Sequence, residues 1–268
     1  MKQFMVNPGA KVDLSKIDPA DTSAWPGVTK ENHQPMLDHV RARLRQQHAM
    51  LIAQRKHRVL VVLQAMDAGG KDGTVRHAFF GLDPQGLTVT SFKAPTATEL
   101  DHDYLWRVHQ RVPGRGEIGV FNRSHYEDIV AVSVRNLAPK EVWERRFEHV
   151  NAFEKMLADE GTTILKFFLH IDQKEQRERL QSRLEDPTKR WKIDPADLAD
   201  RARWDDFQRA YESVLSRTST AHAPWFVIPA NRKWFRNLAV ASILRDTLQE
   251  LKLEYPPVNA ALAHVTAL

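Results

Sequence analysis

Five short apolar runs alternate along the chain with longer segments in which apolar residues recur every three or four positions. We expect the short runs to be strands, over residues 59–63, 87–92, 117–121, 162–169 and 225–228. The longer segments predict helices, over residues 72–80, 98–112, 140–159, 173–184, 194–215 and 234–253. Strands separated by helices indicate a parallel sheet covered on both faces, with ligands at the carboxyl ends of the strands. The pattern therefore predicts an α/β fold.

The segment before the first strand predicts one more helix. Thr29 with Asn32 would open it, and Pro35 fits only within its first turn. An apolar stripe at helical spacing follows, made of Met36, Val40, Leu44, Leu51 and Ile52. Residues 1–28 carry three prolines and predict an extended arm. We expect residues 29–255 to form the single domain and residues 256–268, which begin with two prolines, to form a loosely held tail.

Composition narrows the class of protein. With 268 residues, of which 42% are hydrophobic, the chain has enough apolar material for a proper core. It has no apolar stretch of about 18 residues and no leader with an apolar centre, which predicts a soluble, cytoplasmic protein without a membrane segment. The absence of cysteine excludes disulfides, thiolate catalysis and cysteine-bound zinc.

The charge pattern suggests an anionic ligand. The net charge of +5 is mild, but basic residues gather before the third strand and in the basic segment 189–192. Nucleic acid is disfavoured, because the chain has no helix-turn-helix, zinc-finger or aromatic RNA-binding motif and its basic residues are interleaved with acids. We therefore expect a polyanionic ligand other than nucleic acid.

A glycine-rich segment directly follows the first strand. Residues 65–74 read Ala-Met-Asp-Ala-Gly-Gly-Lys-Asp-Gly-Thr. Successive backbone N–H groups in such a turn, backed by a helix N-terminus, form an anion socket, and a lysine adds a mobile charge. The predicted phosphate-binding residues are Ala68, Gly69, Gly70, Lys71, Asp72, Gly73 and Arg76. The standard motif has Gly in place of Ala65 and Ser or Thr in place of Asp72, so a plain strand-to-helix turn is the alternative.

Asp67 is unusual inside an anion socket, because a carboxylate repels phosphate. A magnesium ion between Asp67 and phosphate resolves this conflict. It would also compensate for the missing Ser or Thr after Lys71. The alternative is an aspartate that shapes the turn through its own backbone.

A second polar cluster follows the third strand, over residues 122–128 (Asn-Arg-Ser-His-Tyr-Glu-Asp). In a parallel sheet it would lie beside the glycine-rich loop. Arg123 could neutralise charge on a transferred phosphoryl group, and Asn122 and Ser124 could orient water or phosphate oxygens. Glu127 or Asp128 could hold magnesium or a nucleoside. The alternative is a strand end followed by a helix that Ser124 caps with Glu127.

A charged helical segment with a basic tip, within residues 173–220, predicts a lid. In kinases such a flap closes over the phosphates and excludes water. Arg183 and Lys192 are its candidate functional residues, and Lys233 and Arg236 could extend the phosphate-binding surface. The alternative is a pair of solvated helices with ordinary surface ion pairs.

These motifs together resemble the polyphosphate kinase 2 family. The resemblance rests on residues 66–73, 121–128, 186–192 (Asp-Pro-Thr-Lys-Arg-Trp-Lys) and 223–225 (Ala-Pro-Trp), and it covers about residues 29–255. It implies a fold similar to that of thymidylate kinase, a P-loop kinase-like three-layer sandwich with a five-stranded parallel sheet and a helical lid. It also implies magnesium-dependent phosphoryl transfer between inorganic polyphosphate and nucleotides.

The resemblance implies roles for single residues. Asp67 would bind magnesium, Lys71 would bind phosphate, and Arg183 would be the lid arginine. Asn122 and Arg123 fall in the Walker B segment. Asn122 stands where other members carry Asp, which makes Asp128 the expected second metal carboxylate.

The sequence of residues 122–128 is similar to that of the subgroup which phosphorylates AMP as well as ADP. Adenine nucleotides, and guanine nucleotides as a second option, are the expected acceptors, with Arg123, Glu127 and Asp128 at the nucleotide. A homo-oligomer, dimer or tetramer, is expected on the same ground. Two rival functions stay open: an ATP-dependent nucleoside or nucleotide kinase, and a non-catalytic regulator that binds polyphosphate or nucleotide.

Overall fold

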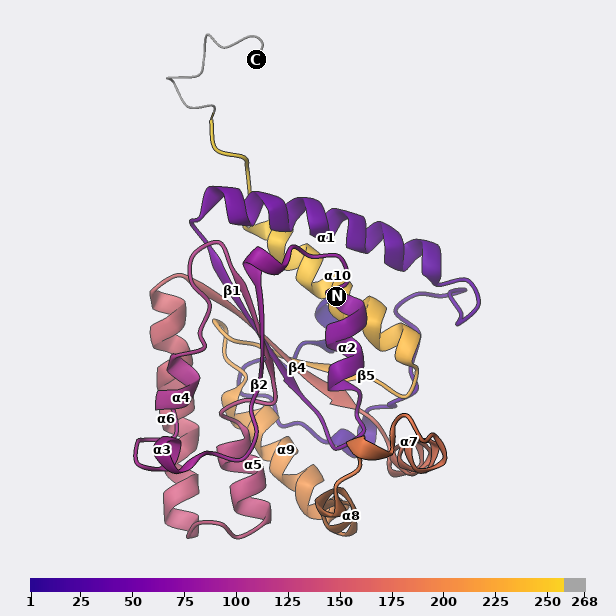
Figure 1. Ribbon diagram of the computed structural model, residues 1–268, viewed down its shortest axis with the longest axis vertical. Helices are drawn as coiled ribbons and strands as arrows, with labels where there is room; N and C mark the ends of the chain where they lie inside the picture. The colour runs from indigo at the N-terminus through magenta and orange to yellow at the C-terminus, as the bar shows by residue number, and fades with distance from the viewer. Residues whose placement is uncertain (258–268) are drawn as a thin grey trace.

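A five-stranded parallel sheet forms the centre of the computed structural model, which describes residues 1–257 (Figure 1). The strand order is β2-β3-β1-β4-β5, and every neighbouring pair is parallel. All five expected strands are confirmed. Their bounds are β1 Arg58–Gln64, β2 Leu87–Ser91, β3 Ile118–Asn122, β4 Thr162–His170 and β5 Trp225–Pro229.

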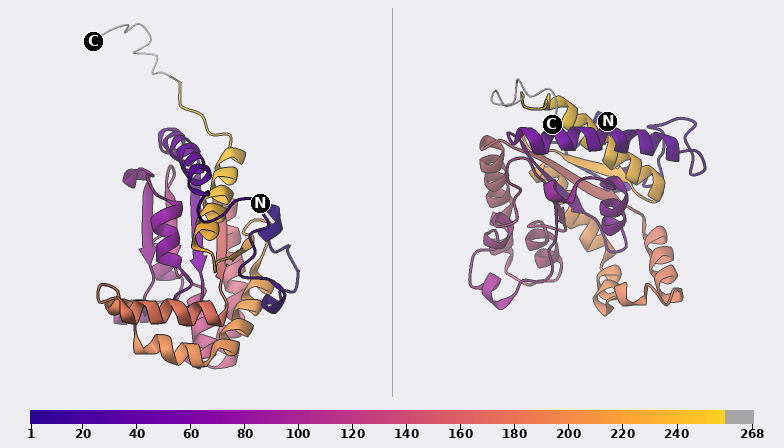
Figure 2. Two further views of the ribbon diagram at one scale, coloured as in Figure 1. Left: turned by 90° about the vertical axis from the view of Figure 1, so that its right-hand side faces the viewer. Right: turned by 45° about the horizontal axis from the view of Figure 1, so that its top comes forward.

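Helices cover both faces of the sheet (Figures 1 and 2). On one face lie α1 Gln34–Gln54, α2 Lys71–Ala78 and α10 Lys233–Glu250, and on the other lie α5 Glu127–Val134, α6 Lys140–Asp159 and α9 Trp204–Thr218. The remaining helices are α3 Ala97–Leu100, α4 Trp106–His109, α7 Gln173–Glu185 and α8 Pro195–Ala202, with 3-10 turns η1 Lys2–Phe4, η2 Leu14–Lys16, η3 Pro84–Gly86 and η4 Arg190–Lys192. The predicted three-layer α/β architecture is confirmed.

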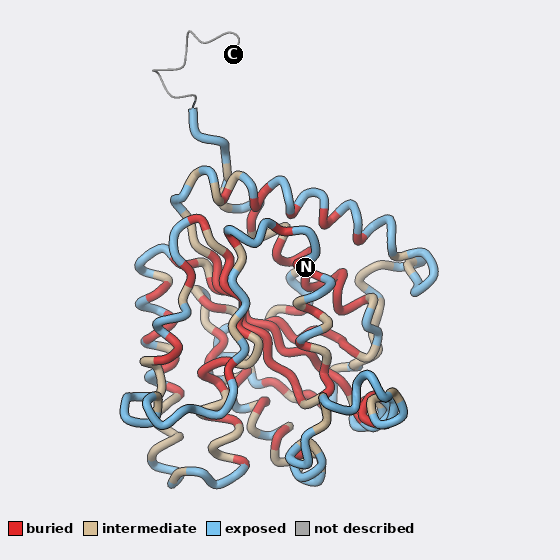
Figure 3. Tube along the Cα trace, in the orientation of Figure 1, coloured by how far each residue is buried: buried red, intermediate tan, exposed pale blue. Residues whose placement is uncertain are grey.

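The central strand shows why its sequence is apolar without interruption. Successive side chains of a strand point to opposite faces, so Val59 and Val61 pack with α1 and α10, whereas Leu60 and Val62 pack with α6 and α9. Because both faces are covered, every residue from Val59 to Gln64 is buried. Figure 3 shows this buried centre and the exposed outer surface of the helices.

Two of the expected helices are broken. Residues 98–112 form α3 and α4 because the Asp103 side chain accepts a hydrogen bond from the Leu105 backbone N–H at 2.9 Å, which replaces the helical bonding pattern. Residues 194–215 divide into α8 and α9 at Arg203, whose φ of −106° is not helical. Side-chain periodicity continues across both breaks, which is why the sequence does not reveal them.

The start of α1 is also later than expected. Thr29 and Asn32 form a turn in which the Thr29 N–H donates to the Asn32 side chain at 2.6 Å, and the helix begins at Gln34. Pro35 then occupies the first turn, where its missing N–H has no cost.

The first residues of the chain lie beside β5, at the edge of the sheet, and the following ones contact α9. Met5 forms an isolated antiparallel bridge with Phe226, and the Val6 N–H donates to the Trp225 carbonyl at 2.8 Å. Four apolar side chains of this segment are buried, namely Phe4, Val6, Val12 and Leu14. Within residues 1–257 no helix has the length and apolar character needed to cross a membrane. The expected tail, 256–268, lies outside the described residues from position 258 onward.

Candidate functional site

The glycine-rich loop, residues 65–70, connects the carboxyl end of β1 to α2 (Figure 1). β1 lies between β3 and β4, so the chain builds one half of the sheet after β1 and the other half after β3. Ligands of open α/β sheets bind at this switch point, beyond the carboxyl ends of the strands. The backbone of the loop is left-handed at Ala68 (φ 59°) and at Gly70 (φ 104°), and α2 begins at the next residue, Lys71.

The glycines of the loop are required by close neighbours. A Cβ on Gly69 would lie 2.5 Å from the Ala65 Cβ, and a Cβ on Gly70 would overlap the Arg236 guanidinium. Gly73 faces the same guanidinium, because a Cβ at this position would lie 2.9 Å from the Arg236 Nη2. The loop and the first turn of α2 therefore fit around Arg236, which comes from α10.

Arg236 is a buried cation whose only side-chain hydrogen bonds in the described structure go to the Asn237 amide oxygen, at 2.8 and 3.2 Å. Burial, together with the neighbouring Arg179, lowers the pKa of Arg236 to about 9. Among the described residues it has no carboxylate partner within ion-pair distance. Positive charge is thus concentrated directly beneath the loop.

Lys71 points back along the loop. Its Nζ donates to the Ala65 carbonyl at 2.9 Å, and the residue is only 9% exposed. Burial lowers the pKa of Lys71 and the nearby Arg123 lowers it further, while Asp67 opposes the shift. The lysine is therefore held in the loop by one backbone oxygen.

Three predicted residues meet in one small cavity. Asp67 forms an ion pair with Arg123, with 2.7 Å between Oδ1 and Nη2, and Glu127 lines the same cavity. Burial alone would lower the pKa of Arg123, but the negative charges of Glu127 and Asp67 outweigh this effect, so the pKa of Arg123 is raised. Arg123 itself has a left-handed backbone, with φ of 62°, which is uncommon for a residue other than glycine.

The segment expected to form the lid also contributes to this cavity. Asp200 of α8 lines it and binds Arg135, the residue that follows α5, through two hydrogen bonds, of 3.0 and 2.5 Å. Burial and the nearby Asp67 raise the pKa of Asp197, while Arg183 opposes the rise. Arg183 itself lies in the last turn of α7 and does not line this cavity.

Asn122 and Ser124 bind protein groups. The Asn122 amide donates to the Asp72 carboxylate at 2.7 Å, which ties the end of β3 to the first turn of α2. The alternative in which Ser124 caps a helix is wrong, because α5 begins after Tyr126 without a side-chain cap and the Ser124 hydroxyl accepts from the Tyr126 N–H at 3.2 Å.

The residues around Asp128 differ from those around Asp67. Its carboxylate lies 3.8 Å from both Arg107 and Arg146, and it does not line the cavity of Asp67. Burial raises the pKa of Asp128, against the effect of these two arginines. The structure thus does not bring the two expected metal carboxylates into one cavity, and residues 1–257 contain no cluster of three or more metal-ligating side chains.

The expected phosphate-binding cations occupy three places. Arg236 lies beneath the loop, and Lys192 lies in η4 with its Nζ 5.2 Å from the centre of the exposed Trp191 ring. Arg76 and Lys233 line a cavity of about 1060 Å³ formed by α1, α2, the start of α10 and the segment before α1. Arg41 and Arg232 also line this cavity.

Sequence reasoning missed the residues of α7 that hold the loop. Arg179 donates to the carbonyls of Ala68 and Gly69, both at 3.0 Å, and Gln176 donates to the Asp67 carbonyl at 3.0 Å. The two side chains are three residues apart and so share one face of α7. The three-residue spacing is the feature of the sequence that indicates a shared face. Because the segment is highly charged, however, both residues resemble solvent-exposed side chains.

Comparison with known proteins identifies the family. The family model described as polyphosphate kinase 2 matches residues 7–256. The chain is 54% identical over 261 residues to the AMP/ADP-polyphosphate phosphotransferase of Meiothermus ruber, covering 97% of each chain. It is 42% identical to the ADP-polyphosphate phosphotransferase of Rhodopseudomonas palustris, covering 97% of this chain and 93% of the relative.

A solved structure shares the whole fold. The crystal structure of polyphosphate kinase 2 from Arthrobacter aurescens TC1 superposes with a TM-score of 0.92 at 43% identity, covering 96% of this chain and 92% of the other. The motifs, the fold and the relatives agree. The chain belongs to the polyphosphate kinase 2 family.

Proposed function

We propose that this protein transfers phosphoryl groups between inorganic polyphosphate and the adenine nucleotides AMP and ADP, with magnesium at Asp67. The observation that carries the proposal is the convergence of Lys71, Arg123 and Asp67 around the glycine-rich loop at the carboxyl end of β1. Family membership and the names of the two relatives support the substrates.

The site is suited to stabilising charge that moves between phosphate oxygens. Lys71 begins α2 after the loop that follows β1, and Arg123 directly follows the neighbouring strand β3. Arg183, in the last turn of α7, is the proposed lid arginine. In phosphoryl transfer the protein acts mainly by positioning and by spreading negative charge. The attacking oxygen is a terminal phosphate oxygen that is already ionised near neutral pH, so no general base is needed.

The residues present fit a magnesium ion that is shared with substrate. Such an ion is held by one or two carboxylates and completes its shell with phosphate oxygens and water, so a full protein cage is not required. Asp67 supplies a carboxylate at the loop, and its present partner is the Arg123 cation. When bound, the ion would neutralise charge on the phosphates. Asp128 stays a proposed second carboxylate, with a nucleotide role as its alternative.

Replacing Asp67 by asparagine is expected to raise the magnesium concentration needed for half-maximal activity, because a charged ligand becomes neutral. The measurement is a magnesium titration of the initial rate at saturating polyphosphate and AMP. Asp159→Asn serves as the control, because Asp159 is an exposed aspartate of α6 that pairs with Lys155. An unchanged titration in Asp67→Asn would make Asp67 a turn residue.

The large cavity beside α2 is the proposed path of the polyphosphate chain beyond the loop. Its cationic side chains outnumber its acids, Glu31 and Glu175, and α2 leads from the loop at Lys71 to the cavity at Arg76. A linear polyanion that leaves the loop along α2 would meet Arg76 and then Lys233.

This path predicts a chain-length effect. Apparent affinity for long polyphosphate should fall more steeply with salt than affinity for short polyphosphate, because a long polyanion releases more counterions on binding. Replacing both Arg76 and Lys233 by glutamine should reduce the salt slope for long chains by about two and change that for short chains little. The check is KM for both donors between low and moderate salt, with Lys140→Gln as a surface control. Equal slopes for the two donors would exclude the path.

One assay tests the proposed reaction as a whole. The protein is incubated with magnesium, polyphosphate and either AMP or ADP, and the formation of ADP and ATP is followed. A strict requirement for ATP as donor would favour a nucleotide kinase, and binding without turnover would favour a regulator. The homo-oligomer is a further proposal, tested by the solution mass of the protein.

A further inference from the structure

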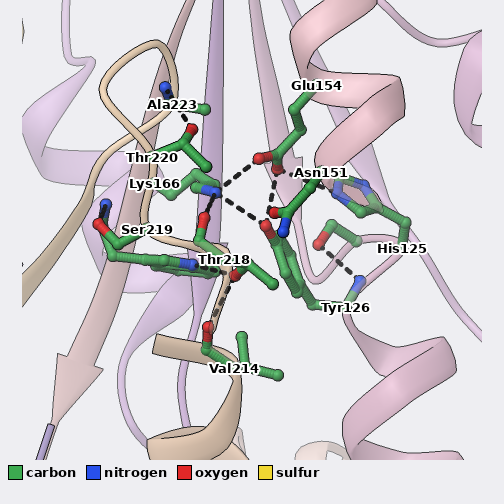
Figure 4. Close-up of polar contacts among 12 residues, drawn as sticks. His125, Tyr126, Asn151, Glu154, Lys166, Val214, Thr218, Ser219, Thr220 and Ala223 are labelled. Carbon is green, nitrogen blue, oxygen red and sulfur yellow. Dashed lines mark hydrogen bonds and ion pairs between the residues drawn. The ribbon is translucent and has the colours of Figure 1, made fainter. Parts of the chain in front are cut away.

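A fully buried polar cluster lies next to the Arg123 turn, on the face of the sheet covered by α6 and α9 (Figure 4). We call it the Lys166 cluster, and its side chains come from His125, Tyr126, Glu154 and Lys166. None of the four is accessible to solvent. None of them lines the Asp67 cavity.

Every proton of the Lys166 ammonium has an acceptor. Its Nζ donates to the Tyr126 hydroxyl at 2.8 Å, to the Glu154 Oε2 at 2.6 Å and to the Thr218 carbonyl at 2.6 Å. The Glu154 Oε1 accepts from the Tyr126 hydroxyl at 2.8 Å and contacts the His125 Nε2 at 3.3 Å. Figure 4 shows these bonds converging between the sheet and α6.

The cluster joins four elements that are far apart in the sequence. Lys166 comes from β4, Glu154 from α6, and Thr218 is the last residue of α9, the helix that follows the lid helix α8. Tyr126 belongs to the turn between β3 and α5, which also contains Arg123. The bonds of one ammonium group therefore fix the position of this turn relative to the sheet and to the end of α9.

Such a cluster is a poor device for stability alone. Removing a carboxylate and an ammonium from water costs more than their attraction commonly returns, and apolar side chains of similar size often do as well or better. Burial alone would raise the pKa of Glu154, but Lys166 and His125 reverse this and hold that pKa below its ordinary value. Burial also lowers the pKa of Lys166, and Glu154 opposes this shift. The hydrogen bonds of the Lys166 Nζ are complete and specific in geometry.

The turn that the cluster holds is strained. Arg123 has a positive φ of 62°, and its N–H donates to the Leu63 carbonyl at 3.1 Å. A side chain in the left-handed region persists only where its surroundings determine the backbone. The next three residues, Ser124 to Tyr126, are all buried, and two of them belong to or contact the cluster.

We propose that the Lys166 cluster is a positioning device for Arg123. Lys166 and Glu154 anchor Tyr126, and the anchored turn keeps the Arg123 guanidinium at the glycine-rich loop, beside Asp67. The inference rests on the proposed function insofar as Arg123 acts in phosphoryl transfer. Lys166 and Glu154 are positioning residues and touch no substrate.

The test replaces the charged pair by neutral side chains of similar size, in the variant Lys166→Met/Glu154→Gln. We expect a folded protein in which kcat falls at least about 10-fold while the KM values for polyphosphate and AMP change less than about 2-fold, because a misplaced group weakens the transition state more than substrate binding. The matched control is Lys155→Met/Asp159→Asn, an exposed ion pair on α6, which should keep the parental kcat. A parental kcat in the buried variant would overturn the proposal.

A double-mutant cycle then asks whether the effect passes through Arg123. In an Arg123→Ala background the same cluster substitutions should lower kcat by less than about 2-fold, because the group they position is already gone. A full loss of about 10-fold in that background would overturn the proposal and assign the cluster a general structural role. Should the double variant not fold, Tyr126→Phe, which removes one hydroxyl only, enters the same cycle with the same outcomes.

A crystal structure of the variant provides a readout that does not depend on activity. Loss of the cluster should allow Arg123 to leave the left-handed region and break its bond to Leu63. An unchanged Arg123 backbone and an intact ion pair with Asp67 would overturn the inference even if turnover fell. If the parent protein showed no polyphosphate-dependent turnover, the proposed function would be contradicted. The comparison of the two crystal structures would then still test whether the cluster positions Arg123.

Discussion

Replacing Lys71 by alanine is expected to lower turnover at least about 10²-fold, because the variant lacks a positive charge that the transferring phosphoryl group needs. In the structure the Lys71 ammonium is held by one hydrogen bond to the Ala65 carbonyl, so it can move to a phosphate at the cost of a single protein contact. The measurement is kcat and KM with saturating magnesium, polyphosphate and AMP.

The fold should survive this substitution. Lys71 is the first residue of α2, where alanine is well tolerated. Removing the lysine also removes the electrostatic repulsion between Lys71 and Arg123. The circular dichroism spectrum and the melting temperature of the variant are therefore expected to stay close to those of the parent. Lys140→Ala on α6 controls for loss of a lysine elsewhere. Near-parental turnover in Lys71→Ala would refute a phosphate role for the loop.

Replacing Gly70 by alanine is the second change with a large expected effect. The new Cβ would overlap the buried Arg236 guanidinium, and the residue would keep a φ of 104° that suits glycine alone. The loop or Arg236 must move, and either movement displaces the backbone N–H groups of the proposed phosphate socket. We expect a loss of kcat of about 10²-fold, since misplacement by about 1 Å can have this effect.

Gly161 offers a matched control for Gly70. It also has a positive φ, of 86°, but a Cβ there would meet no atom within 4 Å. Gly161→Ala should therefore lose about 1–2 kcal/mol of stability from backbone strain and keep parental turnover well below its melting temperature. If the two variants lost activity equally, the contact between Gly70 and Arg236 would have no part in the effect.

The order of the elements could be predicted because the central strands are covered on both faces. Burial of β1 demands a continuous apolar run, and β4 has a similar run apart from Lys166. The motif residues Asp67 and Lys71 follow β1 in the sequence. Asp67 and Arg123 meet because parallel strands β1 and β3 are neighbours and end together, as the pairing of Leu63 with Asn122 shows.

Other features depend on contacts that no local pattern encodes. The buried Arg236 lies in α10, most of which is buried, and the loop-binding Arg179 lies in the highly charged α7. Only the packing of these helices against the loop distinguishes the two side chains from surface arginines. The same holds for Asp128, which follows Glu127 in sequence but turns to Arg107 and Arg146. The breaks within the two expected helices arise from single turns, to which helical periodicity is insensitive.

The segment around Val6 has a consequence for the behaviour of the protein at high concentration. β5 is an edge strand, and edge strands with free backbone groups can pair with strands of other molecules. The Val6 N–H donates a hydrogen bond to the Trp225 carbonyl, and the Ser219 hydroxyl donates to the Val6 carbonyl at 2.6 Å. Met5 and Val6 thus cover part of this edge, and we expect them to hinder the addition of a strand from another molecule at β5.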